Sequence, residues 1–506
     1  MTFSWPQGRG EEAEGLRNAS DPRPNRDSCP WNPYSESHRP CLSEFRDGRL
    51  PWTIQPPFFE DSMTVATTID PKQVHEIIGR HQLADGYDMV LDVNKSHGPW
   101  LHDAARGEDF LDCFTCFASW PLGYNHPGLN DPDFERELLG AAKCNPSNAD
   151  LYSREMASFV DAFATHASPE GFDHHFWIAG GSLAVENAIK AAFDWKARRL
   201  GRHDFNDDVN DLMVVHFQYA FHGRSGYTMS MTNTLPDKVG LFPKFKWPRI
   251  SSPGIEFDLD GNISNDVAAL EAHALAELET FRTRCPAGGD KIAAVLIEPI
   301  QCEGGDRHFR PEFMQGLRSF CDRADALLCL DEVQTGFFGS GKPWMWQHHG
   351  VAPDVVAFGK KAQVCGIYAG KKLDEVKENV FVRSSRINST WGSNLVDMVR
   401  SRRFIELIVE HDYVNNVAAR GEQILAGLRR IAKDSGAFTA PRGVGSLLAV
   451  DYPDGEARDA AIGRCYKERL IVLPCGPRTM RLRIPLNMTE AEANEVLNRV
   501  EAAAKP

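Results

Sequence analysis

Long hydrophobic runs are missing from this sequence. No apolar stretch approaches the roughly 20 residues that a membrane-spanning helix needs. The first 30 residues also lack the hydrophobic centre of a secretory signal. We therefore expect a cytoplasmic protein with no membrane partner.

An excess of positive charge is missing as well. The chain has 56 Lys and Arg against 70 Asp and Glu, which gives a formal net charge of −14. Because a nucleic-acid binder needs a basic footprint, this balance argues against nucleic acid as a partner. A length of 506 residues, 42% of them hydrophobic and 25% charged, is typical of a globular protein of two or more domains.

Cysteine pairs with metal-ligand spacing are scarce. The 12 cysteines show no repeating spacing, and the only C-x-x-C runs from Cys113 to Cys116. One such pair without a second is weak evidence for a zinc or redox site, so we predict no metal site. Others, such as Cys329, lie in apolar runs and are expected to be small buried hydrophobes in a reducing cytoplasm.

Residues 1–62 differ in composition from the rest of the chain. They are rich in Pro, Arg, Ser, Asn and Glu and show no sustained period, which predicts a disordered N-terminal extension. Because Met63 follows directly, we hypothesise that translation starts there. The intact mass of the protein from its native host tests this, and a 506-residue species would contradict it.

Short apolar runs alternate with helical patterns after about residue 170. The runs are HHFWIAG, LMVVHF, IAAVLIEPI, ALLCLDEV and VVAFGKK. This alternation predicts an α/β domain with a mainly parallel sheet, which we assign to residues 126–392. From residue 393 to 506, amphipathic helices and short strands predict a smaller α+β domain, completed by residues 63–125.

Ligands of such sheets bind at the carboxyl ends of the strands, so the residues after each run are candidates for a site. Gly181 and Ser182 follow the run 175–178 and begin a helix, whose free N–H groups favour an anion such as phosphate. A simple tight turn is the alternative. A hydrolase elbow, G-x-S-x-G, is excluded because Ala184 replaces its last glycine.

Aromatic and charged side chains follow the next runs. Phe221 and Arg224 come after the run 212–217 and suit a planar aromatic ligand and a carboxylate. Glu303 comes after the run 292–297, where it can form a removable ion pair with an arginine. A packed phenylalanine and a surface arginine are the alternative for the first pair.

Two more charged residues follow buried runs. Asp331 ends the run 327–330, where a carboxylate is costly unless it is paired, and a helix cap or ion pair is the alternative reading. Lys360 follows a run and a glycine. It is either a solvated surface charge or a Schiff-base lysine, because desolvation frees the nucleophilic amine.

The stretch GFFGSGKP resembles a phosphate-binding P-loop in its spacing. Gly336, Gly341 and Lys342 are correctly placed, but Pro343 stands where the motif requires Ser or Thr. The preceding strand is also expected to end at about Asp331, too early for a P-loop. We therefore predict a glycine-rich turn and not a nucleotide site.

The motifs G-G-S-x-A-x-x-x-A, F-H-G-R, E-P-I-Q-x-E-G-G, D-E-V-Q-T-G and F-G-K-K together resemble the class III aminotransferases. The resemblance covers residues 63–506. It implies an α/β enzyme of fold type I with pyridoxal 5′-phosphate as cofactor. AFHGRSGYTMSMTNT, FPKFKWPRI, EGGDRHFRPEF and NSTWGSNL are similar to the branch that transfers the terminal amine of L-lysine to 2-oxoglutarate.

The resemblance also implies roles for the cofactor-side residues. Lys360 matches the Schiff-base lysine, whereas Lys361 is expected to point away because adjacent residues after a strand point apart. The other matches are Asp331 to the pyridine nitrogen, Phe221 on the ring face, Gln334 to the ring's phenolic oxygen, Gly181 and Ser182 to the phosphate, and Thr390 to the phosphate of the neighbouring subunit. A homodimer with shared active sites follows from the last of these.

Four residues match substrate-binding positions of the family. Arg224 is implied to hold the carboxylate far from the reacting carbon, and Arg481 the one next to it. Glu303 is implied to neutralise Arg481 while lysine is bound and to swing aside for the oxo acid. Asn388 is implied to contact the substrate.

This chain departs from the family pattern at two positions. Cys302 stands where glycine is common and could limit the swing of Glu303, and Ile484 stands in place of a proline. Another ω-aminotransferase, acting on ornithine, 4-aminobutyrate or a diamine, remains an alternative. So do a P-loop nucleotide-binding protein and a catalytically silent family member.

Overall fold

The computed structural model describes residues 69–284 and 289–505. The predicted extension 1–62 and Met63 lie outside this range. No helix in the described part of the chain is long and apolar enough to cross a membrane.

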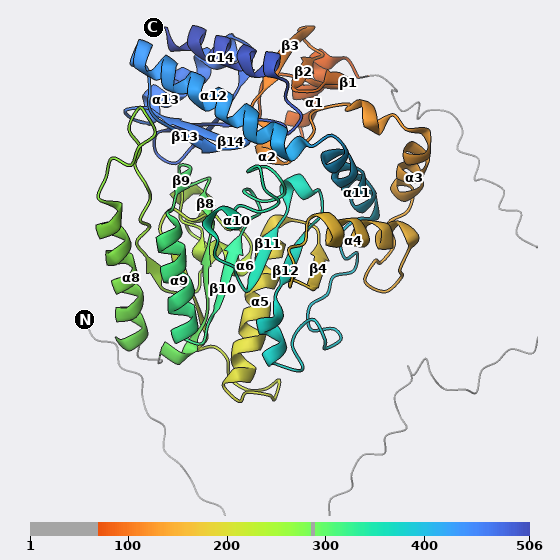
Figure 1. Cartoon of the computed structure of the whole chain (residues 1–506). Coiled ribbons are helices and arrows are strands. Elements are labelled where there is room, and N and C mark those ends of the chain that lie inside the picture. The colour runs from red at the N-terminus through yellow and green to blue at the C-terminus, as the bar shows by residue number, and fades with distance from the viewer. Residues whose placement is uncertain (1–68, 285–288, 506) are drawn as a thin grey trace, which may run out of the picture. The chain divides into compact units, whose positions relative to one another are not determined.

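A seven-stranded sheet forms the centre of the fold, with strand order β4-β12-β11-β10-β7-β5-β6 (Figure 1). All neighbours pair in parallel except β12, which is antiparallel to both β11 and β4. The strands are β4 (His174–Ile178), β5 (Met213–Phe217), β6 (Arg249–Ile250), β7 (Ile292–Ile297), β10 (Leu327–Asp331), β11 (Val355–Phe358) and β12 (Cys365–Ala369). The predicted α/β fold with a mainly parallel sheet is confirmed.

Helices cover both faces of this sheet, and the strand residues alternate between them. In β10, Leu327 and Cys329 pack with apolar residues of α5 (Gly181–Arg199). Leu328 and Leu330 point the other way and pack with residues of α9 (Pro311–Arg323). Burial on both faces explains why these strands are apolar at nearly every position.

Two four-stranded sheets contain the C-terminal strands. One has the order β13-β14-β17-β16, and in the other β15 pairs in parallel with β3 of the N-terminal strands β1-β2-β3. Their strands are β1 (Leu91–His97), β2 (Trp100–Asp103), β3 (Glu108–Asp112), β13 (Thr439–Val444), β14 (Leu447–Asp451), β15 (Leu470–Ile471), β16 (Leu473–Cys475) and β17 (Thr479–Arg483). Segments near 100 and 470 therefore share a sheet, and the exact domain boundaries stay predictions.

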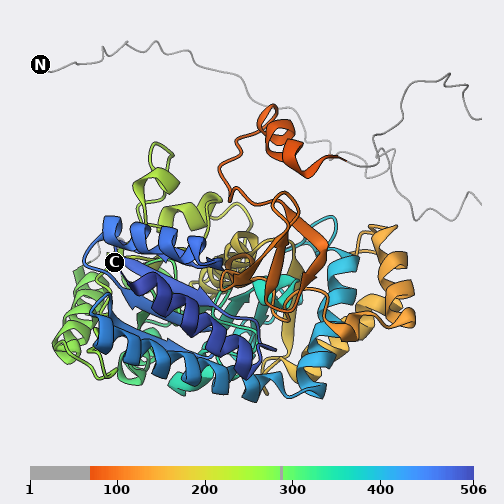
Figure 2. The ribbon, with the colours of Figure 1, turned by 90° about the horizontal axis from the view of Figure 1, so that it is seen from above.

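The remaining elements complete these layers. α12 (Tyr413–Ser435), α13 (Gly455–Lys467) and α14 (Glu490–Ala504) lie side by side, as Figures 1 and 2 show in blue. The other helices are α1 (Val74–Gly79), α2 (Thr115–Ala118), α3 (Pro132–Ala142), α4 (Arg154–His166), α6 (Gly226–Met231), α7 (Pro236–Val239), α8 (Val267–Arg284), α10 (Trp346–His349) and α11 (Leu395–Glu410). A short antiparallel ribbon is formed by β8 (Ile300–Gln301) and β9 (Arg307–His308).

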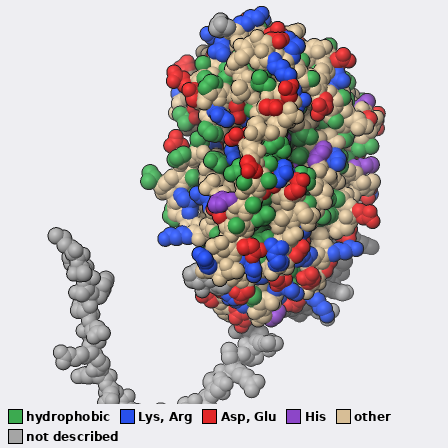
Figure 3. Space-filling model, turned by 60° about the vertical axis from the view of Figure 1, so that its left-hand side comes forward, with side chains coloured by type: hydrophobic (Ala, Val, Ile, Leu, Met, Phe, Trp, Pro, Cys, Tyr) green, Lys and Arg blue, Asp and Glu red, His purple; other side chains and the backbone are tan. Residues whose placement is uncertain are grey.

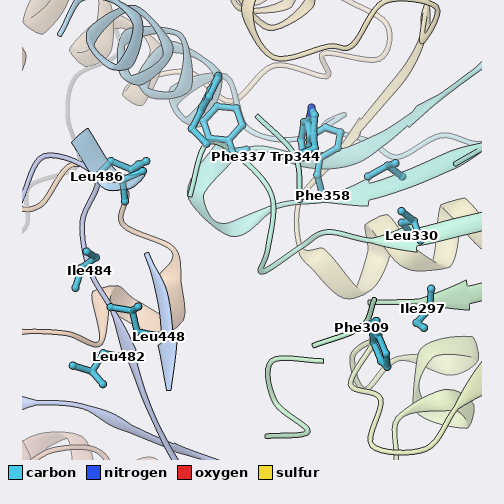
Figure 4. Packing of buried hydrophobic residues seen from close by; sticks show 14 of the residues in the cluster. Ile297, Phe309, Leu330, Phe337, Trp344, Phe358, Leu448, Leu482, Ile484 and Leu486 are labelled. Atoms are coloured by element: carbon cyan, nitrogen blue, oxygen red, sulfur yellow. The ribbon is translucent and has the colours of Figure 1, made fainter. Parts of the chain in front are cut away.

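One buried cluster joins the seven-stranded sheet to the C-terminal strands. Figure 4 shows Trp344 beside Phe358, with ring centroids 5.7 Å apart. Leu448 and Leu482, from β14 and β17, belong to the same cluster. The ends of the large sheet and the strand that carries Arg481 are therefore packed on one continuous core.

The described surface is mixed in charge. On the face drawn in Figure 3, Lys and Arg side chains are interspersed with Asp and Glu, and hydrophobic side chains lie among them. This face of the described chain thus presents both signs of charge close together.

Candidate active site

A cavity of about 520 Å³ lies at the carboxyl ends of the parallel strands. Most of its lining residues lie at or just after the ends of β4, β5, β7, β10 and β11, whereas Ser119 follows α2 and Cys365 begins β12. The lining residues are Ser119, Gly181, Ser182, Phe221, His222, Gly223, Glu298, Asp331, Val333, Gln334, Lys360, Gln363 and Cys365. These segments are far apart along the chain, yet the sheet brings their side chains to one edge. Gly181, Ser182, Phe221, Asp331, Gln334 and Lys360 are the predicted site residues among them.

Two glycines shape the side of the cavity next to α5. A Cβ at Gly181 would lie 2.6 Å from a methyl of Val333, and a Cβ at Gly223 would lie 2.3 Å from the hydroxyl of Ser182. Gly223 also has a φ of +122°, which side-chain-bearing residues rarely adopt. The backbone therefore approaches the start of α5 closely, where free N–H groups favour an anion.

Asp331 is buried and fully oriented by its neighbours. One carboxylate oxygen accepts the N–H of Val333 at 3.0 Å, and the other lies 2.8 Å from Nδ1 of His222. His222 is itself buried, and its Nε2 has no hydrogen-bond partner among the described residues. The imidazole therefore holds the carboxylate in one orientation at the end of β10.

The side chains of Lys360 and Lys361 point in different directions. Lys360 lines the cavity, with a φ of +51° just beyond β11. Lys361 turns away and donates to the carbonyl of Gln334 at 2.6 Å. Burial lowers the pKa of Lys360 to about 8, and the nearby charge of Arg481 adds to the shift. Only Lys360 therefore presents a nucleophilic amine to the cavity.

Glu298 is a site residue that sequence reasoning missed. It lines the cavity, and its carboxylate accepts the N–H of Phe221 at 2.9 Å. Burial, and then the charge of Asp331, raises the pKa of Glu298 well above its usual range. Glu298 directly follows the apolar run 292–297, just as Asp331 follows the run 327–330. This position was the sequence signal that could have identified it.

A second cavity of about 600 Å³ contains the other predicted switch residues. Arg481, on β17, is 1% exposed and donates to Glu303 at 2.6 Å. It also donates to the side-chain oxygen of Gln334 at 3.3 Å, which connects this cavity to the first. Burial acts to raise the pKa of the Glu303 carboxyl, but Arg481 and Lys238 outweigh it and hold that pKa below its usual value.

Three predicted residues do not line either cavity. Arg224 is exposed beside the first one. Asn388 and Thr390 are exposed on the segment before α11, where Asn388 accepts the N–H of Ser389 at 2.8 Å. The structure therefore brings the cofactor-side residues and the Glu303–Arg481 pair together within one chain, but not these three.

The stretch Gly336–Lys342 lacks the geometry of a P-loop. β10 ends at Asp331, and the next helix, α10, begins only at Trp346. The Lys342 amine donates to the carbonyl of Gln347 at 3.2 Å. Among the described residues, no three His, Cys, Asp or Glu side chains cluster so as to hold a metal ion.

Comparison with known proteins gives the family. The family model for class III aminotransferases matches residues 83–504. The chain belongs to the class III aminotransferases. These enzymes use pyridoxal 5′-phosphate, and the cavity fits that group: it offers a free lysine, a buried carboxylate and a glycine-lined helix start.

Several of its relatives are described as L-lysine-epsilon aminotransferases. The L-lysine-epsilon aminotransferase of Amycolatopsis lactamdurans is 48% identical, over 86% of this chain and 96% of that protein. A protein of the same description from Streptomyces clavuligerus is 46% identical, over 85% and 94%. A solved structure of lysine aminotransferase from M. tuberculosis, in its internal aldimine form, matches with a TM-score of 0.81 and 47% identity, over 86% and 99%.

Proposed function

We propose that this class III aminotransferase is an L-lysine:2-oxoglutarate 6-aminotransferase. Its products are 2-aminoadipate 6-semialdehyde and L-glutamate. The observation that carries the proposal is the ion pair of the buried Arg481 with Glu303 beside the cavity of Lys360. The similarity to relatives described as L-lysine-epsilon aminotransferases supports the choice of donor.

The cofactor-side residues have distinct tasks in this proposal. When bound, pyridoxal 5′-phosphate supplies a ring that withdraws electrons from the substrate carbon. Lys360 holds the group and carries the proton at that carbon, and Asp331 keeps the ring nitrogen protonated. Phe221 covers the ring face, and the backbone of Gly181 and Ser182 binds the phosphate.

The side-chain oxygen of Gln334 is engaged by two arginines. Its side-chain oxygen accepts from Arg481 at 3.3 Å and from Arg483 at 3.2 Å. The amide group is therefore oriented with its N–H donors free for the phenolic oxygen of the ring. This arrangement supports the role expected from the resemblance.

Arg481 and Glu303 distinguish the two substrates. The terminal amine of L-lysine carries no carboxylate beside it, so Glu303 neutralises Arg481 while lysine reacts. The oxo acid brings a carboxylate next to its reacting carbon, and that carboxylate takes Arg481. Arg224 holds the distant carboxylate of either substrate.

We further propose a cytoplasmic homodimer with shared active sites. Thr390 and Asn388 are exposed and do not line the cavity of their own chain. A second copy supplies them, Thr390 to the phosphate and Asn388 to the substrate. A role in lysine catabolism is one use of the reaction, and supply of a precursor for a secondary metabolite is the other.

Addition of L-lysine without an oxo acid is expected to bleach the visible-violet absorbance of the holoenzyme. The amine of lysine converts the cofactor to its pyridoxamine form, which absorbs at shorter wavelength. The measurement is an absorbance spectrum before and after addition. A band that persists after addition of L-lysine but is lost after addition of ornithine, 4-aminobutyrate or a diamine would establish another ω-aminotransferase.

Replacing Glu303 by alanine is expected to reduce the preference for L-lysine over donors with a carboxylate beside the amine by about tenfold or more. The reason is that Arg481 is then free to bind that carboxylate throughout the cycle. The measurement is kcat/KM for L-lysine and for L-glutamate as donors. Glu303→Gln keeps the size and should behave the same way, and unchanged donor preference in both variants rejects the switch.

A further inference from the structure

Lys238 is a third charged residue at the Glu303–Arg481 pair. It lies in the four-residue helix α7, and its amine contacts the Glu303 oxygen that Arg481 does not use. The same amine lies over the ring of Phe221, 5.2 Å from its centroid. Glu303 is therefore held between two cations, one on each carboxylate oxygen.

The two cations lie at different depths. The side chain of Arg481 is 1% exposed, whereas those of Glu303 and Lys238 are 19% and 18% exposed. All three line the 600 Å³ cavity. Glu303 therefore connects Arg481, at the buried wall of the cavity, to Lys238, at the rim of the cavity. When an oxo-acid carboxylate takes Arg481, Glu303 loses its inner partner and keeps only the outer one.

The backbone at Glu303 leaves little freedom for any larger movement. Cys302 is fully buried and packs with Ile300, Met345 and Leu447. A Cβ at Gly304 would lie 2.2 Å from the carbonyl of Tyr219. Displacement of Glu303 is therefore a change of side-chain rotamer, and the cation that pairs with the displaced carboxylate must lie within reach of that side chain.

Lys238 meets this requirement better than the other cation of the cavity. Arg458 is engaged by Asp459 at 2.8 Å and by the carbonyl of Gly476 at 3.0 Å. A carboxylate that leaves one cation without reaching another is strongly destabilised when it is poorly hydrated. The charge of Lys238 prevents this outcome.

We propose that Lys238 is the positioning residue that holds Glu303 in its displaced state, and so determines how well the enzyme accepts 2-oxo dicarboxylic acids. The inference rests on the proposed switch between Arg481 and Glu303. It assigns to Lys238 a function mainly in the second half-reaction. In the first half-reaction, with L-lysine, Glu303 keeps Arg481 as a partner, so loss of Lys238 leaves it with one cation.

The test compares the two half-reactions in three variants. Lys238→Met removes the charge and keeps the length, Lys238→Arg keeps the charge, and Lys246→Met removes an exposed charge of the same connecting segment. One half-reaction uses the pyridoxal-phosphate form with L-lysine, and the other uses enzyme loaded with pyridoxamine phosphate and 2-oxoglutarate. Isothermal titration calorimetry of 2-oxoglutarate on the pyridoxal-phosphate form, which cannot react with it, gives a readout independent of turnover.

Lys238→Met is expected to weaken the binding of 2-oxoglutarate about tenfold, in KM and in the calorimetric Kd, and to slow the lysine half-reaction by less than this. Lys238→Arg should restore binding, and Lys246→Met should match the wild type. An equal loss in both half-reactions, an unchanged KM for 2-oxoglutarate, or no restoration by arginine would each overturn the inference. A wild-type enzyme that does not react with 2-oxoglutarate would instead contradict the proposed function, and the inference with it.

Discussion

Replacing Lys360 by alanine is expected to lower turnover by about 100- to 10,000-fold, because the variant loses the proton carrier at the reacting carbon. It should also lose the visible-violet absorbance, since Lys360 alone presents its amine to the cavity. The measurements are the absorbance spectrum of the purified protein after addition of pyridoxal phosphate, and kcat with L-lysine and 2-oxoglutarate.

Lys361→Ala is the matched control, because the two lysines are adjacent, Lys361 being buried and Lys360 half-buried. This variant should keep the absorbance band. It should lose stability by about 1–3 kcal/mol, because the carbonyl of Gln334 is left without its donor. Equal loss of the band in both variants would show that the wrong lysine was chosen or that the segment is mainly structural.

Asp331→Asn is expected to lower kcat by about 100- to 1,000-fold. A neutral amide no longer stabilises the positive charge on the ring nitrogen, so the ring withdraws electrons less strongly. The amide oxygen can still accept from Val333, so the fold around β10 should persist. The measurement is the rate of the lysine half-reaction by stopped-flow absorbance, with the melting temperature recorded for each protein.

Asp354→Asn provides the control for general damage. Asp354 is buried and forms an ion pair with Arg318 at 2.8 Å, but it does not line the cavity. Its replacement should lower the melting temperature and leave kcat unchanged. A similar fall of kcat in both variants would mean that Asp331 acts through stability and not through the ring nitrogen.

The central strands were predictable because the sheet is buried on both faces. The apolar runs at 175–178, 212–217, 292–297 and 327–330 coincide with β4, β5, β7 and β10 to within one residue at either end. The run before Gly359 coincides with β11. A strand that is covered on both faces is apolar at nearly every position. Such a strand can therefore be predicted from the sequence without knowing its register or its pairing partners.

Other strands carry no such signal. β1 is mostly exposed, and its alternation of apolar and polar residues stops after Asn94, because Lys95, Ser96 and His97 are all polar. β12 was not anticipated either, because Cys365–Ala369 follows β11 with only a single 3-10 turn, Lys360–Ala362, and no α-helix between them. Its antiparallel return to β11 depends on pairing that only the folded chain reveals.

The same distinction holds for the site. Asp331 and Lys360 were predictable because Asp331 ends one buried strand and Lys360 lies two residues beyond the end of another. The partners that orient them were not: His222 reaches Asp331 across 109 positions of the chain, and Lys238 reaches Glu303 across 65. Contacts over such separations depend on tertiary structure and leave no local pattern.

The residues that face the cofactor and those that face the substrate are carried by different parts of the scaffold. Asp331 ends β10 and Lys360 follows β11, and these two strands are hydrogen-bonded neighbours in one sheet. Arg481 lies on β17 of a second sheet, and Glu303 follows the ribbon strand β8. Small sliding of one sheet against another therefore changes the spacing of the substrate-facing pair while the cofactor-facing pair stays rigid. We therefore expect motion of the two sheets to change substrate recognition more than retention of the cofactor.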